Sequence, residues 1–342
     1  MWEGGTVVCP TGFQSQPTRL TYVRFEGSDV VLSTGVAGLL VHGGAWNIPD
    51  NELAEHRDGL QEAIAVGGAL MKRGAPALEV VTEVVASLEQ HGGFDAGRGA
   101  VLTKRGEVEL DAGVMDGATM HFGGVAATKR LASPIRVARV VAERGDGQAR
   151  LLVSDGAELF AESAGFELVE NGILVCDRER RRYAELSRNR TYHTSQTFMA
   201  EDGPRGTVGC VARDRSGNVA AATSTGGTPF RPSFRVGDTP IPGAGFYANA
   251  NVAASATGWG EAIATVLLCG RAVFGFATDV SVAGQIETLL TEMGARVRNQ
   301  EGAPATGGLI ALSVTGHGGW GYTTPRMARG GWDEDNGVWL AV

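Results

Sequence analysis

Two short apolar runs around a polar turn form the clearest pattern in the chain. Residues 208–213 and residues 219–224 are mostly small or apolar, and the sequence Asp-Arg-Ser-Gly-Asn at 214–218 separates them. Such runs, bounded by Gly, Asn and Asp, are typical of buried strands joined by a tight turn. The pattern therefore predicts a β-hairpin.

The register of this hairpin decides which residues meet at its open end. If Arg213 pairs with Val219, Thr207 lies opposite Thr225, with the two Cβ atoms about 4.5–5.5 Å apart. A slip of one residue would bring Ser224 across instead. Either register places two hydroxyl side chains together, which ordinary strand packing could also explain.

Apolar side chains at helical or strand-like spacing predict the other elements. Stripes with members three and four residues apart indicate helices, and short apolar runs beside glycine indicate strands. Helices are expected over residues 50–73, 76–88, 133–141, 155–160, 260–274 and 279–293. Strands are expected over residues 39–46, 94–102, 107–117, 120–127, 151–153, 252–257, 307–312 and 318–322.

The two ends and one internal segment have weaker patterns. Residues 22–32 resemble two strands around a turn, within an N-terminal extension of unknown role over residues 1–37. Residues 177–206 begin with a run of charges and continue without periodicity, which indicates a flexible linker. Residues 330–336 resemble a tail, and we expect one domain over residues 38–342.

Composition and charge narrow the class of protein. The 342 residues carry a net charge of −8, which argues against a nucleic-acid-binding surface. The 51 glycines follow no Gly-X-Y period and therefore indicate tight turns and close backbone contacts. Four scattered cysteines show no metal-ligand spacing, so no metal site is expected from side chains. Neither a signal peptide nor a run of 18 apolar residues is visible, which predicts a cytoplasmic protein without membrane contact.

One pair of opposite charges lies in a turn-rich loop. Arg235 and Asp238 are three residues apart among glycines and prolines. A guanidinium holds a carboxylate with two parallel hydrogen bonds, and an aspartate accepts from an ammonium. The pair could bind an amino acid at both ends, or it could be a surface ion pair of little energetic worth.

Three further segments contain residue types that can take part in catalysis. The small-residue strand over 252–257 runs into a glycine turn, where a hydroxyl or a backbone N–H can stabilise an oxyanion. His42 precedes two glycines, and we interpret it as a structural histidine rather than a catalytic one. The linker ends at Gly206, directly before Thr207, as a chain would if the bond between these residues is cut.

At this point the chain resembles the plant-type L-asparaginase / isoaspartyl peptidase family of N-terminal-nucleophile threonine hydrolases. Several blocks in one order carry the resemblance over about residues 38–325. They are His-Gly-Gly-Ala-Trp at 42–46, Phe-Asp-Ala-Gly-Arg-Gly at 94–99, Leu-Asp-Ala-Gly-Val-Met-Asp-Gly at 110–117, Gly-Thr-Val-Gly at 206–209, Thr-Ser-Thr-Gly-Gly at 223–227, Arg-Val-Gly-Asp at 235–238, Pro-Gly-Ala-Gly-Phe-Tyr-Ala at 242–248 and Ala-Thr-Gly-Trp-Gly-Glu at 256–261.

The resemblance implies a fold and a mode of activation. The fold would be α+β, a four-layer αββα sandwich. A precursor would cut itself between Gly206 and Thr207, giving an α subunit of residues 1–206 and a β subunit of residues 207–342. Thr207 would then be the nucleophile, and its freed α-amine, with an ordinary pKa of about 7.7–8.0, the base. Isoaspartyl dipeptides, L-asparagine or both would be the substrates, and aspartate a product.

The resemblance also implies roles for individual residues. Thr225 supports the nucleophile, Arg235 and Asp238 bind the substrate's carboxylate and amine, Thr257 and Gly258 form the oxyanion hole, and Gly260 contacts the substrate. It implies a homodimer of processed units and no catalytic cofactor. A structural sodium ion would be held by backbone carbonyls of the loop at about residues 88–98.

Two departures from the family pattern leave substrate preference open. Asp95 stands where the family usually has Asn, and Trp259 replaces a small polar residue in the oxyanion turn. A glycosylasparaginase-type amidase and a non-catalytic amino-acid-binding homologue are the alternatives. The glycine before Thr207 favours the asparaginase branch, and self-cleavage would argue against the non-catalytic homologue.

Overall fold

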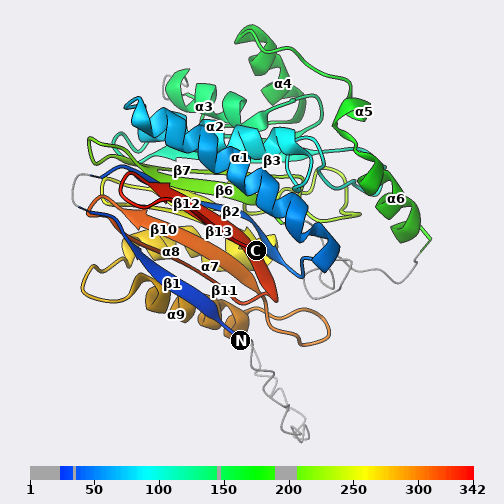
Figure 1. Cartoon of the computed structure of the whole chain (residues 1–342). Coiled ribbons are helices and arrows are strands. Elements are labelled where there is room, and N and C mark those ends of the chain that lie inside the picture. Colours follow the sequence, from blue (N-terminus) through cyan, green and yellow to red (C-terminus); the bar gives the residue numbers. More distant parts are fainter. Residues whose placement is uncertain (1–23, 34–35, 145–147, 189–205) are drawn as a thin grey trace, which may run out of the picture.

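The computed structural model describes residues 24–33, 36–144, 148–188 and 206–342. Within them, two β-sheets lie one above the other, and helices cover their outer sides (Figure 1). Helices α1, α2 and α3 pack on the larger sheet, and α8 and α9 pack on the smaller one. Strands of the two sheets contact each other directly, β2 with β10 and β7 with β9.

The larger sheet brings together strands from both halves of the chain. Its order is β13-β12-β2-β6-β7-β3-β4-β5, and every neighbouring pair is antiparallel except β4 and β5. Its strands are β2 (Gly38–Trp46), β3 (Leu110–Asp116), β4 (Phe122–Thr128), β5 (Leu151–Val153), β6 (Val208–Arg213), β7 (Val219–Thr225), β12 (Arg326–Asp333) and β13 (Gly337–Ala341).

The smaller sheet is antiparallel throughout, with the order β1-β11-β10-β9-β8. Its strands are β1 (Glu26–Val31), β8 (Phe246–Ala248), β9 (Val252–Gly258), β10 (Gly307–Ser313) and β11 (His317–Tyr322). The helices are α1 (Leu53–Lys72), α2 (Ala77–His91), α3 (Pro134–Arg144), α4 (Ser154–Ser163), α5 (Asn171–Leu174), α6 (Asp177–Leu186), α7 (Gly260–Val266), α8 (Leu268–Phe274) and α9 (Val282–Arg296), with a short 3-10 helix, η1 (Asp50–Glu52).

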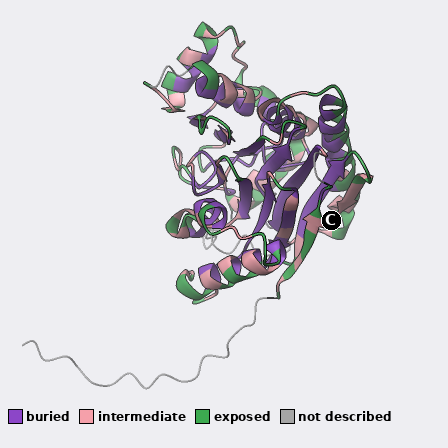
Figure 2. Cartoon of the chain, turned by 90° about the vertical axis from the view of Figure 1, so that its left-hand side faces the viewer, coloured by how far each residue is buried: buried purple, intermediate pink, exposed green. Residues whose placement is uncertain are grey.

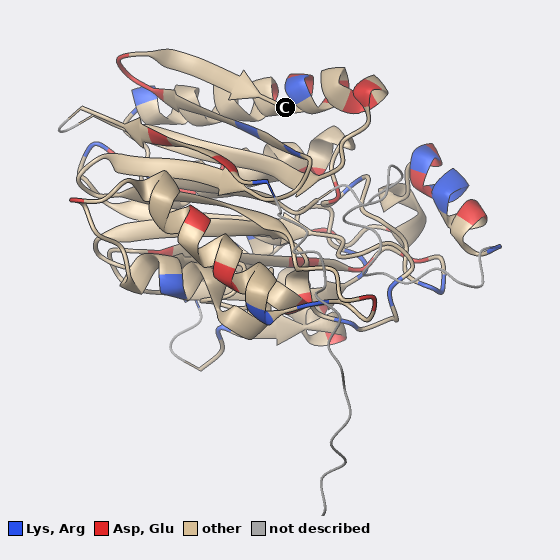
Figure 3. Cartoon of the chain, turned by 90° about the horizontal axis from the view of Figure 1, so that it is seen from below, with Lys and Arg blue, Asp and Glu red and all other residues tan. Residues whose placement is uncertain are grey.

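Small side chains allow the two sheets to close on each other. β7 contributes Ala221 and β9 contributes Ala253 to the apolar cluster between the sheets, where Val211 and Ile310 also lie. Figure 2 shows the strands as buried and the outer helices as buried on one side only. Figure 3 shows charged residues mainly on helices and loops. The sheets therefore form a mainly apolar centre, and most charged residues lie outside it.

The predicted hairpin register is confirmed. Arg213 pairs with Val219 and Val208 with Ser224, so the strands are aligned as the first of the two registers requires. Thr207 directly precedes β6, and Thr225 is the last residue of β7. The open end of the hairpin therefore holds both hydroxyl residues.

Several sequence predictions at the ends of the chain are wrong. Residues 27–29 form no turn, because β1 runs straight through them and pairs with β11. The domain therefore includes part of the predicted extension, while residues 1–23 lie outside the described residues. Residues 330–336 are not a tail, since β12 pairs with β2 in the larger sheet.

Other predictions fail within the chain. Residues 177–186, predicted as the start of a linker, form helix α6, which buries Glu179; residues 189–205 lie outside the described residues. Residues 94–101 form a loop rather than a strand, because Gly97 and Gly99 have φ of +50° and +98°. Leu267, with φ of +53°, divides the helix predicted over 260–274 into α7 and α8.

Candidate active site

A chain of hydroxyl contacts begins at Thr207. Its Oγ1 donates to Thr225 Oγ1 over 3.2 Å, and both residues are almost fully buried. Thr225 Oγ1 accepts the backbone N–H of Gly227 over 3.0 Å and donates to Asp95 Oδ2 over 3.4 Å. The two threonines predicted to meet therefore do so, and a carboxyl group continues the chain beyond them.

Gly206 fits between two parts of the structure that leave no room for a side chain. A Cβ at Gly206 would lie 2.7 Å from Gly44 Cα and 3.0 Å from Thr257 Oγ1. Gly44 itself has φ of +105°, and a Cβ there would lie 2.6 Å from Gly206 Cα. The Thr257 hydroxyl accepts Ala45 N–H over 3.3 Å, which leaves its proton free to donate. This geometry places a donor beside the Gly206–Thr207 bond.

The glycine turn that follows Thr257 is required by close backbone contact. Gly258 has φ of +132°, and a Cβ there would lie 2.5 Å from Gly307 Cα. Trp259 is half-buried and packs on the apolar cluster beneath α7, α8 and α9. Its ring is therefore accommodated in the outer helical layer, which sequence reasoning did not anticipate.

His42 contacts the backbone of Thr207, which the sequence analysis did not predict. Its Nδ1 is 3.0 Å from the carbonyl oxygen of Thr207, and its Nε2 is 2.7 Å from Ser255 Oγ. Because a carbonyl only accepts, Nδ1 carries the proton and Nε2 accepts from the serine. Burial lowers the pKa of His42 to about 3, so the ring is neutral. A neutral ring that holds the backbone of Thr207 agrees with the structural interpretation of this histidine.

Arg235, Asp238 and Gly260 converge on one point. A Cβ at Gly260 would lie 2.6 Å from Asp238 Oδ1 and 3.0 Å from Arg235 Nη2. Arg235 Nε donates to Glu261 Oε1 over 2.8 Å, and Nη2 lies 2.7 Å from the same oxygen without hydrogen-bond geometry. Within the described residues, Arg235 Nη2 and Asp238 Oδ2 are buried without a hydrogen-bond partner. A guanidinium N–H and a carboxyl oxygen that are buried without hydrogen-bond partners suit a ligand with both a carboxylate and an ammonium.

Burial makes the carboxyl groups of this region unusually basic. Burial raises the pKa of Asp238 to about 7, and nearby Arg235 lowers it only in part. Burial also raises the pKa of Asp111, on the β3 strand opposite Thr225. A bound cation would stabilise the ionised form of both carboxyl groups, because a nearby positive charge lowers the pKa of a carboxyl group.

Arg231 holds the backbone around the site in place, and the sequence analysis did not single it out. Its guanidinium is fully buried and donates to the carbonyl oxygens of Gly226 and Glu109 over 3.0 and 2.7 Å, and also to that of Arg235. It therefore ties the end of β7 to the loop that carries Arg235. No motif marked it, because its partners are backbone carbonyls, and that of Glu109 is 122 positions away in the sequence.

The loop at residues 88–98 has contacts that disfavour a cation at two of its carbonyls. Arg178 of α6 donates to the carbonyl of Gly92 over 3.1 Å, and the carbonyl of Glu89 accepts Arg98 N–H over 2.9 Å. A sodium ion near Gly92 would be repelled by the guanidinium. The sodium ion therefore stays a prediction. Among the described residues, no group of three or more His, Cys, Asp or Glu is placed to hold a metal ion.

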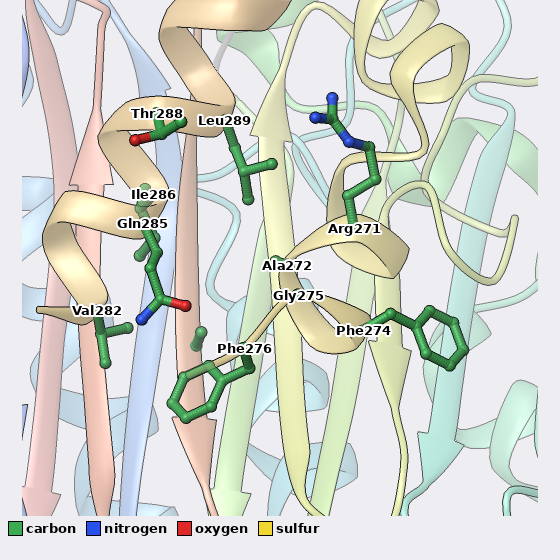
Figure 4. Close-up of a pocket in the computed structure, with 11 residues that line it drawn as sticks. Arg271, Ala272, Phe274, Gly275, Phe276, Val282, Gln285, Ile286, Thr288 and Leu289 are labelled. Carbon is green, nitrogen blue, oxygen red and sulfur yellow. The ribbon is translucent and has the colours of Figure 1, made fainter. Parts of the chain in front are cut away.

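A pocket of about 500 Å³ between α8 and α9 is separate from these residues. Its lining is mainly apolar, including Phe274, Phe276 and Leu289 (Figure 4). Its polar side chains have partners, since Arg271 pairs with Glu292 and Gln285 bonds to the backbone of Ala277. The pocket therefore offers no group for chemistry. No helix in the described part of the chain is long and apolar enough to cross a membrane.

Comparison with known proteins gives one consistent result. A family model described as asparaginase matches residues 35–341. The chain is 42% identical to the isoaspartyl peptidase/L-asparaginase of Danio rerio over 238 residues, 69% of this chain and 74% of that protein. It is 38% identical to the isoaspartyl peptidase of Salmonella typhimurium over 305 residues, 86% and 94% of the two chains. It is 36% identical to the plant-type L-asparaginase of Pyrobaculum calidifontis over 299 residues, 85% and 95%.

Proposed function

The chain belongs to the asparaginase family, and from this premise we propose that it is an amidohydrolase activated by its own cleavage. It hydrolyses isoaspartyl peptides, L-asparagine or both, as the names of its relatives state for them. The observation that carries the proposal is that Arg235 Nη2 and Asp238 Oδ2 are buried side by side without hydrogen-bond partners, which matches the α-carboxylate and α-amine of such substrates. The bond to be cut is then the amide on the substrate's side chain.

In the proposed mechanism, cleavage between Gly206 and Thr207 frees the α-amine of Thr207. That amine accepts the proton of the Thr207 hydroxyl as the oxygen attacks the substrate amide. Thr257 and Gly258 stabilise the oxyanion, and Thr225 holds the nucleophile through the 3.2 Å contact. The leaving amine takes the proton, and water then hydrolyses the ester to aspartate and free Thr207.

Three further features belong to the proposal. The αββα arrangement in four layers is supported by helices packed on the outer side of each sheet and by contacts between the sheets. The family resemblance implies a homodimer of processed units, and a cytoplasmic location stays an expectation of the sequence analysis. Dimerisation is tested by the mass of the processed protein in solution.

The intact mass of the protein after incubation near neutral pH tests the proposal. We expect two fragments, residues 1–206 and residues 207–342, and hydrolysis of a β-aspartyl dipeptide or asparagine. Thr207→Ala should give one uncut chain without amidase activity, because it removes the attacking hydroxyl. Arg235→Ala should raise KM sharply for substrates with a free α-carboxylate. Cut or active Thr207→Ala protein would contradict the nucleophile, and an unchanged KM would remove Arg235 from the site.

A further inference from the structure

The uncut chain lacks the base that the mature enzyme would use. Before cleavage, the nitrogen of Thr207 is a peptide amide, which has no basic lone pair. His42 contacts the carbonyl of Thr207 and Ser255, not the Thr207 hydroxyl. Within the described part of the chain, the Thr207 hydroxyl donates its hydrogen bond to Thr225. The hydrogen bond to Thr225 leads from the Thr207 hydroxyl toward a proton acceptor beyond Thr225.

The hydrogen bonds of Thr225 point toward such an acceptor. A hydroxyl oxygen has one proton and two lone pairs. One lone pair receives Gly227 N–H, which leaves the other lone pair for Thr207 and the proton for Asp95. Because a carboxylate can only accept, both hydroxyl bonds run from Thr207 to Asp95.

The backbone fixes the carboxyl group of Asp95 at the end of this chain. Its Oδ1 accepts Val101 N–H over 2.9 Å, and its own carbonyl accepts Gly226 N–H over 3.1 Å. A Cβ at Gly226 would lie 2.4 Å from Asp95 Oδ1, so glycine permits the close approach. With Oδ1 held, Oδ2 faces Thr225 over 3.4 Å, a long contact of the kind that tightens during catalysis.

We propose that Asp95, acting through Thr225, accepts the proton of the Thr207 hydroxyl during self-cleavage; this inference rests on the proposed self-processing. The Thr207 oxygen bonds to the carbonyl carbon of Gly206, and the Gly206–Thr207 C–N bond breaks. The hydroxyl proton passes to Thr225, whose own proton passes to Asp95. The Thr207 nitrogen gains a proton from solvent, and Asp95 returns its proton to solvent. Water then hydrolyses the ester, leaving a Gly206 carboxylate and a free Thr207.

The electrostatic surroundings suit this role. Burial raises the pKa of Asp95 to about 7, and the charge of Glu179 acts in the same direction. The Val101 N–H and the charges of Arg231 and Arg182 lower it in part. A general base works best when its pKa lies near the working pH.

A matched pair of isosteric variants tests the proposal. Asp95→Asn keeps the volume but cannot accept a proton. Asp214→Asn alters another buried carboxyl group at the other end of the same hairpin, where Asp214 accepts Ala77 N–H and Asn218 N–H. Freshly purified chains are incubated near neutral pH, and the fragments are followed by intact mass. We expect Asp95→Asn to be cut at least about tenfold more slowly, from the usual worth of a general base, and Asp214→Asn at the wild-type rate.

The kinetics of the mature protein separate a proton acceptor from a structural support. In cut Asp95→Asn protein the free amine is the base, so the cleavage rate should fall at least about tenfold more than kcat. Equal losses in both rates, or cleavage at the wild-type rate, would overturn the inference. A wild-type chain that is never cut would instead overturn the proposed function.

A second pair of variants keeps the test decisive if Asp95→Asn does not fold. Thr225→Ser keeps the linking hydroxyl and should be cut much as the wild type is. Thr225→Val keeps the shape, removes the hydroxyl and should be cut at least about tenfold more slowly. Equal rates for the two variants would overturn the inference, because the proton could not then pass through Thr225.

Discussion

Asp238 is a residue at which binding and stability have opposite requirements. Its ionised form would hold the substrate's ammonium, yet burial raises its pKa to about 7. Arg235, Glu261 and Asp111 are the charged groups that act on it. We expect KM to rise as the pH falls below about 7, because protonation removes the anchor. KM measured from pH 5.5 to 8.5 tests this, with Asp238→Asn as the control whose KM should be high and independent of pH.

The same carboxyl group should weaken the fold at high pH. Its folded pKa lies above the unfolded value, so the folded state gains from the proton at low pH and loses that gain as the pH rises through about 7. Asp238→Asn should therefore raise the free energy of unfolding by about 1–3 kcal/mol at pH 8 and change it little at pH 4. Urea unfolding at both pH values measures this free energy. An Asp238→Asn protein less stable than the wild type at pH 8 would contradict the predicted direction.

His42 should act through hydrogen bonding rather than charge. With a pKa of about 3, it stays neutral across the physiological range. His42→Ala leaves the carbonyl of Thr207 and the hydroxyl of Ser255 without this partner, so we expect a loss of about 1–3 kcal/mol of stability and slower self-cleavage. Thermal unfolding and intact mass are the measurements. The exposed His121 provides the control, and equal behaviour of His121→Ala and His42→Ala would refute the role.

At the scale of elements, β1 fixes the beginning of α9. Asp29 Oδ1 accepts Ala283 N–H over 2.7 Å and the Ser281 hydroxyl over 3.1 Å, so it caps a helix more than 250 positions away. Asp29→Ala should cost about 1 kcal/mol and speed amide exchange in the first turn of α9. Hydrogen exchange mass spectrometry measures it. Ser28, whose hydroxyl contacts only a neighbouring carbonyl, supplies the control Ser28→Ala, and unchanged exchange in Asp29→Ala would contradict the cap.

At the scale of the whole molecule, the larger sheet joins the two products of cleavage. β2 comes from the part before Thr207, yet it lies between β12 and β6 of the part after it. β7 pairs in turn with β3 of the first part. The two fragments should therefore elute together in native buffer and unfold in one transition, because separation would break four strand ladders: β2 with β12, β2 with β6, β3 with β7 and β1 with β11. Size-exclusion chromatography with mass detection tests this, and separate elution would contradict the sheet order.

The sequence determined whatever depends on local pattern and on short motifs. It predicted the register that joins Thr207 to Thr225, since alternation and a tight turn allow few pairings. It also singled out Arg235, Asp238 and Gly260, which the fold brings to one point. It misjudged β12, because a strand rich in glycine has little apolar signal of its own.

Tertiary structure alone decided what depends on distant partners. Arg231 and His42 are held by backbone atoms far away in the sequence, and such contacts leave no spacing to detect. The place of Asp95 at the end of the hydroxyl chain depends on a loop meeting the end of β7. A motif can name a residue, whereas the direction of its hydrogen bonds and the burial of its charge follow only from the packed sheets.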